Sequence, residues 1–258
     1  MLGAHNPRLE RVRALRTKKG RREQGRFAIE GPTLLHEAVR SGTPIEELYG
    51  TPEALQASEV ARRVESGGVP VYSIDERAMR RLSDLDTPPG LLAVAPVSLR
   101  DVSDLFSSAG LVLALAGVSD PGNAGALLRA AEAFGVTRVV FDRSAVEPYA
   151  PKVVRGAMGS LFRLALAVAS AAETSEAAKG WEITSLDSGG SPIEGLPWAP
   201  RSLLVVGQER HGLGDWKNVS ARLAAISMKG NAESLNAAVA GGIALYQAAK
   251  RMDAGAES

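Results

Sequence analysis

The second half of the chain carries continuous runs of aliphatic residues without polar alternation. Segments rich in Ala, Leu and Glu separate these runs, and the chain closes on a helical pattern from about Leu235 to Arg251. Continuous hydrophobicity is typical of strands buried on both faces, and helical connections make such strands parallel. The pattern predicts an α/β domain over 111–258 with a parallel sheet covered on both faces. The runs are LVLALAG at 111–117, RVVF at 138–141, LFRLALAV at 161–168, WEITSLD at 181–187, SLLVVG at 202–207 and LAAISM at 223–228.

The first half has shorter elements of alternating type. FAIEG at 27–31 and LLAVAPV at 91–97 have the pattern of strands. PTLLHEAVRSG at 32–42 has the pattern of a helix that begins at a proline and ends at a glycine. Residues 98–110 are polar and rich in Ser and Asp, which is typical of a linker with one short helix. We therefore expect a smaller α/β domain over 1–97, a linker over 98–110 and the larger domain after it.

Composition narrows the possible chemistry. The 258 residues are 45% hydrophobic, enough for one large core or two modest ones, and they include no cysteine. Disulfides, zinc-thiolate sites, iron–sulfur clusters and thiolate nucleophiles are thereby excluded. No apolar run approaches the roughly 20 residues that span a bilayer, and the basic start lacks a hydrophobic signal core. We expect a cytoplasmic protein without a membrane partner.

The formal net charge of +1 averages two differently charged parts. Residues 8–26 hold nine Lys or Arg against two acids, a local charge of +7, so the other 239 residues sum to −6. Leu9, Val12 and Leu15 recur at helical spacing, which predicts a basic amphipathic helix that runs into a flexible stretch at 20–22. Phosphate binding and a solvated helix face remain alternative interpretations of this segment.

The loops that follow the parallel strands are where ligands bind in such sheets. In the first of them, Gly117 and Gly122 have the outer spacing of a phosphate-binding P-loop, but Asn123 and Ala124 replace the Lys and Ser or Thr. In the second, Gly212 and Gly214 begin a dinucleotide fingerprint that Lys217 breaks. These failures argue against an NTPase, a nucleotide-dependent oxidoreductase and an ordinary Rossmann-type methyltransferase. Three scattered histidines give no metal site: His5, His36 and His211.

Polar side chains gather after the same strand ends. Taken singly, each has a structural explanation, such as a helix cap for Asn123 or an ion pair of Arg129 with Glu132. Five such residues at one edge of the sheet predict a functional site: Asn123, Arg129, Glu209, Ser234 and Asn236. In the last helix, Gly241 and Gly242 interrupt an apolar stripe, which predicts close backbone approach by another element or subunit.

Three segments resemble, in order and spacing, the signature motifs of a known family. GVSDPGNAGALLRAAEAFGV, LLVVGQERHGLGD and ISMKGNAESLNAAVAGGIALYQ are similar to the motifs of the SpoU (TrmH) RNA ribose 2'-O-methyltransferases in the SPOUT superfamily. RGAMGSLFRLAL resembles the segment that links them. The N-terminal part is similar to the ribosomal-protein-like RNA-binding domain of members that act on ribosomal RNA.

The resemblance implies a C-terminal trefoil-knotted methyltransferase domain, a homodimer and S-adenosylmethionine as methyl donor, with S-adenosylhomocysteine as product. It carries the five polar residues over as catalytic residues. Three positions depart from the family pattern, Ser227, Ala237–Ala238 and Gln208, and the first two lie beside the donor pocket. The implied cofactor-binding residues are Gly207, Ile226, Met228 and Leu235. The basic segment supplies the expected RNA-binding residues: Arg11, Arg13, Lys18, Lys19, Arg21 and Arg22.

The implied reaction is a displacement at a sulfonium methyl, which requires no metal. The family assigns activation of the hydroxyl to the arginine at position 129, but a guanidinium stays protonated in proteins. We hypothesise that Arg129 stabilises a developing alkoxide or works with a substrate phosphate. The expected function is methylation of a ribose 2'-hydroxyl in ribosomal RNA. The alternatives are a transfer RNA substrate, an antibiotic-resistance role and a non-catalytic RNA-binding protein.

Overall fold

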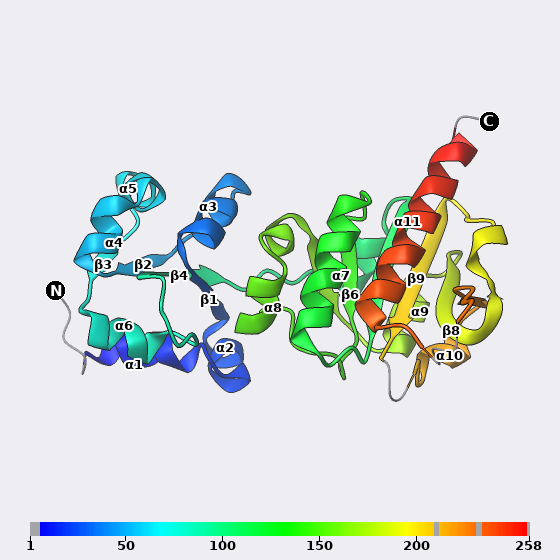
Figure 1. The fold of residues 1–258 in the computed structure, drawn as a ribbon, viewed down its shortest axis with the longest axis horizontal. Helices are drawn as coiled ribbons and strands as arrows, with labels where there is room; N and C mark the ends of the chain where they lie inside the picture. The colour runs from blue at the N-terminus through cyan, green and yellow to red at the C-terminus, as the bar shows by residue number, and fades with distance from the viewer. Residues whose placement is uncertain (1–5, 209–211, 231–233, 257–258) are drawn as a thin grey trace. The chain divides into compact units, whose positions relative to one another are not determined.

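The computed structural model describes residues 6–208, 212–230 and 234–256, which form two compact units (Figure 1). Unit 1 takes its described residues from 1–98 and 149–162, and unit 2 takes its own from 99–148 and 163–258. The expected linker is part of unit 2, because Leu105 and Phe106 are buried in the core of that unit. The guanidinium of Arg138 also donates hydrogen bonds to the carbonyl oxygens of Leu105 and Ala109.

Unit 1 is built on a four-stranded sheet in the order β1-β4-β2-β3. β4 pairs antiparallel with both β1 and β2, and β2 pairs parallel with β3. In Figure 1, α1 and α6 cover one face of this sheet, and α3, α4 and α5 cover the other. The elements are α1 (Pro7–Ala14), α2 (Lys18–Gln24), β1 (Arg26–Glu30), α3 (Pro32–Arg40), β2 (Glu47–Gly50), α4 (Pro52–Ala57), α5 (Glu59–Ser66), β3 (Val71–Ser73), α6 (Glu76–Leu82), β4 (Leu91–Pro96), α8 (Pro151–Gly156) and the 3-10 turn η2 (Ser160–Arg163), which ends at the first residue of unit 2.

The basic segment forms two helices rather than one helix and a flexible stretch. The Thr17 side chain accepts a hydrogen bond from the Gly20 N–H and caps α2, so residues 20–22 are helical and the expected flexibility is wrong. Gly20 permits this tight turn, because a Cβ at that position would lie 2.1 Å from the Ala14 carbonyl oxygen. Leu9, Val12 and Leu15 face the core, as the helical spacing predicts.

A segment from the middle of the sequence completes unit 1. The expected larger domain runs without interruption over 111–258, whereas 149–162 belong to unit 1. Tyr149 packs its ring on Phe27 with centroids 4.5 Å apart, and its hydroxyl donates to the Ser98 carbonyl oxygen at 2.8 Å. Burial raises the pKa of the Tyr149 phenol to about 12. The segment is therefore held by packing as well as by hydrogen bonds.

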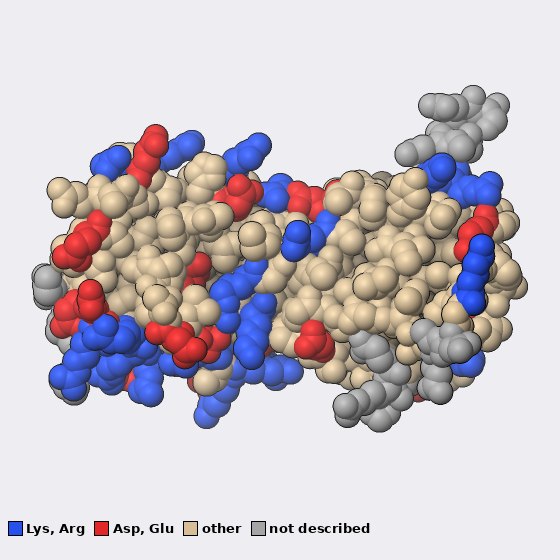
Figure 2. All heavy atoms as spheres, viewed as in Figure 1, with Lys and Arg blue, Asp and Glu red and all other residues tan. Residues whose placement is uncertain are grey.

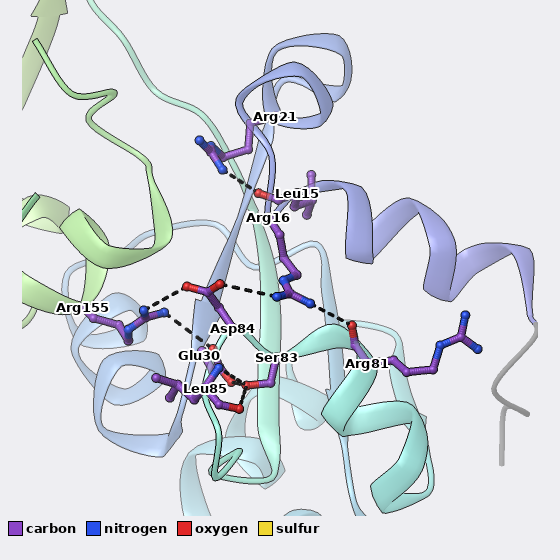
Figure 3. A network of polar contacts seen from close by, with 9 residues as sticks. All are labelled: Leu15, Arg16, Arg21, Glu30, Arg81, Ser83, Asp84, Leu85 and Arg155. Atoms are coloured by element: carbon purple, nitrogen blue, oxygen red, sulfur yellow. Dashed lines mark hydrogen bonds and ion pairs between the residues drawn. The ribbon is translucent and has the colours of Figure 1, made fainter.

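A polar network ties α8 to the sheet of unit 1 (Figure 3). Arg155 contacts Glu30 at 3.8 Å and Asp84 at 3.1 Å, and Asp84 also contacts Arg16 at 3.6 Å. The Ser83 hydroxyl donates a hydrogen bond to Glu30, whose side chain is only 7% exposed. A buried carboxylate needs such partners, because an uncompensated charge in the interior is costly.

Unit 2 contains a six-stranded sheet in the order β10-β8-β9-β5-β6-β7. All of its strand pairs are parallel, which confirms the parallel α/β sheet that the hydrophobic runs predict. Helices α7 and α11 lie side by side over one face, and α9 and α10 lie over the other (Figure 1). The elements are η1 (Val102–Phe106), β5 (Gly110–Ala116), α7 (Pro121–Ala133), β6 (Arg138–Phe141), β7 (Ala165–Val168), α9 (Ala171–Ala177), β8 (Glu182–Pro192), η3 (Ile193–Gly195), β9 (Arg201–Gly207), α10 (Trp216–Val219), β10 (Arg222–Ala225) and α11 (Ala237–Ala256).

The two glycines of α11 differ in their surroundings. A Cβ at Gly241 would lie 2.3 Å from Leu127 of α7 and 3.1 Å from Val206 of β9, so this glycine lets α11 approach both elements. The predicted close backbone approach is thus confirmed at Gly241. At Gly242, the nearest atom to such a Cβ is 4.0 Å away, on Ala130, which is ordinary contact. Across the described residues, no helix has the length and apolar character that crossing a membrane requires.

Candidate functional site

A cavity of 220 Å³ is lined by the middle of β8, the ends of β9 and β10, and the segment that leads into the first turn of α11. The carboxyl ends of parallel strands are the usual ligand-binding edge of such a sheet. Most of the lining is apolar or small, with backbone groups from the loops between the apolar side chains. The described lining residues are Leu186, Asp187, Ser188, Val206, Gly207, Gln208, Gly212, Ala224, Ala225, Ile226, Met228, Ser234, Leu235, Ala237 and Ala240.

The structure brings all four expected cofactor-binding residues to this one cavity. Gly207, Ile226, Met228 and Leu235 line it, although they belong to three separate parts of the sequence. Gly207 ends β9 at a tight return of the chain, where Gln208 and Gly212 exchange two backbone hydrogen bonds. A Cβ at Gly207 would lie 2.8 Å from the Gly212 carbonyl oxygen, so this loop closes only around glycine.

Two asparagines from distant motifs are hydrogen-bonded to each other. Asn236 Nδ2 donates to Asn123 Oδ1 at 2.9 Å. The Asn236 side-chain oxygen accepts from the N–H groups of Ala238 and Val239 and so caps the start of α11. Asp120 caps α7, accepting from the Asn123 N–H at 2.7 Å. The sequence suggests that Asn123 caps this helix, but the cap is Asp120. The Asn123 side chain is hydrogen-bonded to Asn236 of the third motif.

Arg129 lies on α7, the helix that carries Asn123 in its first turn, and it is exposed. The structural explanation that the sequence offers, a pair with Glu132, is wrong because Glu132 pairs with Arg163. Within the described part of the chain, no hydrogen bond or ion pair engages the Arg129 guanidinium. A solvent-facing guanidinium is suited to bind phosphate or stabilise a developing oxyanion.

Of the two other residues expected to be catalytic, Ser234 and Glu209, the structure describes only Ser234. Ser234 lines the cavity, two residues before Asn236, and is exposed. Glu209 lies outside the described residues, so its place at the site stays a prediction. No group of three or more metal-binding side chains occurs among the residues that the structure describes.

Lys and Arg side chains gather over α1, α2 and α6 of unit 1 (Figure 2). Five of the six expected RNA-binding residues are exposed there: Arg11, Arg13, Lys18, Lys19 and Arg22. Arg21 corrects the expectation, because it is 4% exposed and donates a hydrogen bond to the Leu15 carbonyl oxygen at 2.8 Å. Its guanidinium joins α2 to the end of α1 and is not available at the surface.

The sequence analysis missed one ionisable side chain in the cavity. Asp187 accepts hydrogen bonds from the Gly189 N–H at 2.9 Å and from Lys217 Nζ at 3.3 Å. The Gly189 N–H, followed by Lys217, lowers the pKa of the Asp187 carboxyl from its ordinary value, despite an opposing effect of burial. A single acid within a strand has no local signature, and its position became informative only with the cavity.

Comparison with known proteins assigns both parts of the chain. Residues 110–246 match the model of the SpoU rRNA Methylase family, and residues 6–93 match the MRM3-like substrate binding domain. The first match spans more than half of the chain and contains the cavity and all five candidate catalytic residues. The second contains the basic helices α1 and α2.

Similar proteins match this chain over nearly their whole length. The chain is 28% identical over 248 residues to the 23S rRNA (guanosine(2553)-2'-O)-methyltransferase RlmP of Bacillus subtilis. The aligned region covers 94% of this chain and 96% of that one. The SpoU methyltransferase AviRb of Streptomyces viridochromogenes, solved with AdoMet, is 26% identical with a TM-score of 0.86, and the match covers 96% of this chain and 98% of that one. The AdoMet-bound rRNA methyltransferase of Sinorhizobium meliloti is 27% identical with a TM-score of 0.85 and covers 95% of each chain. The chain belongs to the SpoU rRNA methylase family.

Proposed function

We propose that the protein transfers a methyl group from S-adenosylmethionine to a ribose 2'-hydroxyl of ribosomal RNA. The family to which the chain belongs and the rRNA methyltransferases to which it is similar support this activity. One structural observation carries the proposal. Ser234 and Leu235 line the cavity, and the next residue, Asn236, is hydrogen-bonded to Asn123 from the first motif. The donor cavity is therefore continuous with three of the five candidate catalytic residues, which are Asn123, Ser234 and Asn236.

The cavity suits the adenosyl part of this methyl donor. Its walls combine apolar side chains with loop backbone, which is the usual composition of small-molecule sites, and small residues at 207, 224 and 225 keep it open. Gly207, Ile226, Met228 and Leu235 are the residues that would hold the donor. When bound, S-adenosylmethionine supplies an electrophilic sulfonium methyl group.

The chain's own residues would position the acceptor hydroxyl. Because a guanidinium stays protonated, Arg129 would either stabilise the developing alkoxide or work in concert with a substrate phosphate. Asn123 and Asn236, fixed by their mutual hydrogen bond, would orient the ribose, and Ser234 and Glu209 would share this role. Alignment of this kind contributes up to roughly 7 to 11 kcal/mol in favourable cases.

Unit 1 would bind the RNA substrate. Arg11, Arg13, Lys18, Lys19 and Arg22 are exposed, and their charge suits the phosphates of a structured RNA. The similarity of residues 6–93 to a substrate binding domain supports this role. A cytoplasmic location follows from a ribosomal substrate.

A homodimer and a trefoil knot in unit 2 are part of the same proposal. α11 exposes three large apolar side chains on one side, Val239 at 52%, Ile243 at 37% and Tyr246 at 47%. A second copy of the chain would cover this surface, as large exposed apolar groups mark interaction sites. Sedimentation should then give twice the 27.0 kDa mass of one chain, and Ile243→Glu should give single chains.

The deciding experiment maps ribose methylation in RNA from cells with and without the gene. The proposal requires one ribosomal 2'-O-methyl group to disappear with the gene and to return with the wild-type protein. Purified protein should restore the mark on unmodified ribosomal RNA when S-adenosylmethionine is added. A missing mark in transfer RNA would instead support the alternative substrate, and unchanged maps would remove the enzymatic function.

A further inference from the structure

The cavity of unit 2 holds one charge among its described lining residues. That charge is on Asp187, while the remaining described side chains of the lining are apolar or neutral, or are absent at glycine. S-adenosylmethionine offers hydrogen-bond donors in three places, which are the adenine amino group, the ribose hydroxyls and the methionyl ammonium. The position of Asp187 in the sheet decides between them.

Asp187 lies just beyond the point where β8 leaves β9. The two strands pair in parallel up to Ser185 and Val205, and the same register brings Asp187 level with Gly207, where β9 ends. In parallel sheets that bind nucleosides, an acid at the end of one strand accepts hydrogen bonds from the ribose, and glycines end the neighbouring strand. Asp187 has a comparable place, because it lies beyond the last residue of β8 that pairs with β9, although β8 itself continues to Pro192.

The Asp187 carboxylate is fixed in place but retains capacity to bind. One oxygen accepts from the Gly189 N–H and the other from Lys217 Nζ. An ionised carboxylate has about four acceptor positions, so these two hydrogen bonds leave positions on both oxygens. The side chain is 24% exposed, and the two partners orient it without occupying all of its acceptor positions.

We propose that Asp187 binds the ribose hydroxyls of S-adenosylmethionine and so positions the methyl donor in the cavity. This inference rests on the proposed methyl donor and adds a residue outside the three signature motifs. Asp187 is a binding residue for the adenosyl group, distinct from the residues that act on the RNA hydroxyl.

The test measures binding by calorimetry, independently of methyl transfer. The ligands are S-adenosylmethionine and 5'-methylthioadenosine, which keeps the adenine and ribose but lacks the amino-acid tail. Asp187→Asn should weaken both about tenfold, since hydrogen bonds to a charged group typically contribute that much. Equal weakening for the two ligands would place the carboxylate at the adenosyl group and exclude the methionyl ammonium, and the dideoxy analogue described below tests the ribose hydroxyls.

Two variants separate binding from anchoring. Asp215→Asn removes one negative charge from an exposed position outside the cavity lining, and Lys217→Met removes the ion pair of Asp187. Both should bind each ligand within about threefold of wild type. A tenfold weakening in Lys217→Met would overturn the proposal, because Asp187 would then act by anchoring the loop.

A ligand-side comparison remains decisive if Asp187→Asn fails to fold. Wild-type protein should bind the 2',3'-dideoxy analogue of 5'-methylthioadenosine about tenfold more weakly than the parent compound. Equal affinity for the two would overturn the inference, as would an effect of Asp187→Asn confined to S-adenosylmethionine. Wild-type protein that binds neither S-adenosylmethionine nor 5'-methylthioadenosine would overturn the proposed function itself.

Discussion

Asn236 donates a hydrogen bond to the Asn123 side-chain oxygen at 2.9 Å, which joins two motifs that are 113 residues apart. The same side chain caps α11 through its oxygen, with the N–H groups of Ala238 and Val239 as donors. One amide therefore has a structural role through its oxygen and a positioning role through its nitrogen. Because the two roles use different atoms, substitution can separate them.

Asn236→Asp should keep stability and lose activity. An aspartate oxygen still caps the helix, and its negative charge is favourable at a helix N-terminus, but aspartate cannot donate to Asn123. We expect the free energy of unfolding to stay within about 0.5 kcal/mol of wild type and the turnover number to fall at least about tenfold. Asn236→Ala, which also removes the cap, should lose about 1 kcal/mol of stability. Full activity in Asn236→Asp would show that the hydrogen bond to Asn123 does not matter.

The fold of unit 2 could be predicted because its signal is local. A parallel strand covered on both faces is apolar at nearly every position, so runs such as 111–117 can be recognised as strands from the sequence. The order of the strands, with β8 between β9 and β10, depends on contacts that leave no such pattern. The candidate site could be assembled from three motifs, but its cavity also takes Asp187 from β8, which lies outside them.

Contacts between distant segments explain the remaining differences. Arg155 belongs to unit 1 because it meets Glu30 and Asp84, which are far from it in sequence. Arg21 lies in a segment whose composition is typical of an exposed basic surface, yet the turn between α1 and α2 buries it against the Leu15 carbonyl oxygen. Neither outcome follows from helical periodicity or local charge.

Arg129→Ala should abolish methyl transfer and leave binding of the methyl donor nearly unchanged. Arg129 is exposed on α7 and does not line the cavity, so its removal takes away stabilisation of the RNA oxyanion alone. Removal of one such donor typically lowers turnover by about 100- to 1000-fold. Arg201→Ala is the matched control, since Arg201 is exposed at the opposite end of β9. Single-turnover assays and calorimetry would measure the two effects, and substantial activity in Arg129→Ala would refute the assignment.

The two adjacent glycines of α11 should respond to alanine with opposite signs. A Cβ at Gly241 would lie 2.3 Å from the fully buried side chain of Leu127, which would have to shift within the core, so Gly241→Ala should lose about 1 to 3 kcal/mol. Gly242→Ala meets only ordinary contact with Ala130 and should gain up to about 1 kcal/mol from helix propensity. Urea unfolding of both variants measures the difference. Equal destabilisation by both would mean that overpacking at Gly241 is not the cause.

Arg155→Ala should destabilise unit 1. The substitution leaves the buried Glu30 carboxylate with Ser83 as a hydrogen-bond donor but without its positive partner. Since Arg155 is 23% exposed, we expect a destabilisation of about 2 kcal/mol, below the range for fully buried pairs. Lys152→Ala on the same helix changes an exposed cation and should stay within about 0.5 kcal/mol. Hydrogen exchange in β1 would report the local effect, and equal protection in the two variants would exclude a stabilising role for the network.

The basic segment should separate into residues that bind RNA and one that supports the fold. Arg11, Lys18 and Arg22 are exposed, so replacing each with Gln should weaken RNA binding and reduce the log–log salt slope by about 0.7 to 0.9 for each phosphate that is no longer neutralised. Arg21→Met should leave that slope unchanged and lower the melting temperature, because the Arg21 guanidinium is bonded to the Leu15 carbonyl oxygen. Filter binding at several salt concentrations, combined with thermal unfolding, distinguishes the two classes. If the three exposed variants keep the wild-type slope, the segment is a solvated helix face and unit 1 binds RNA elsewhere.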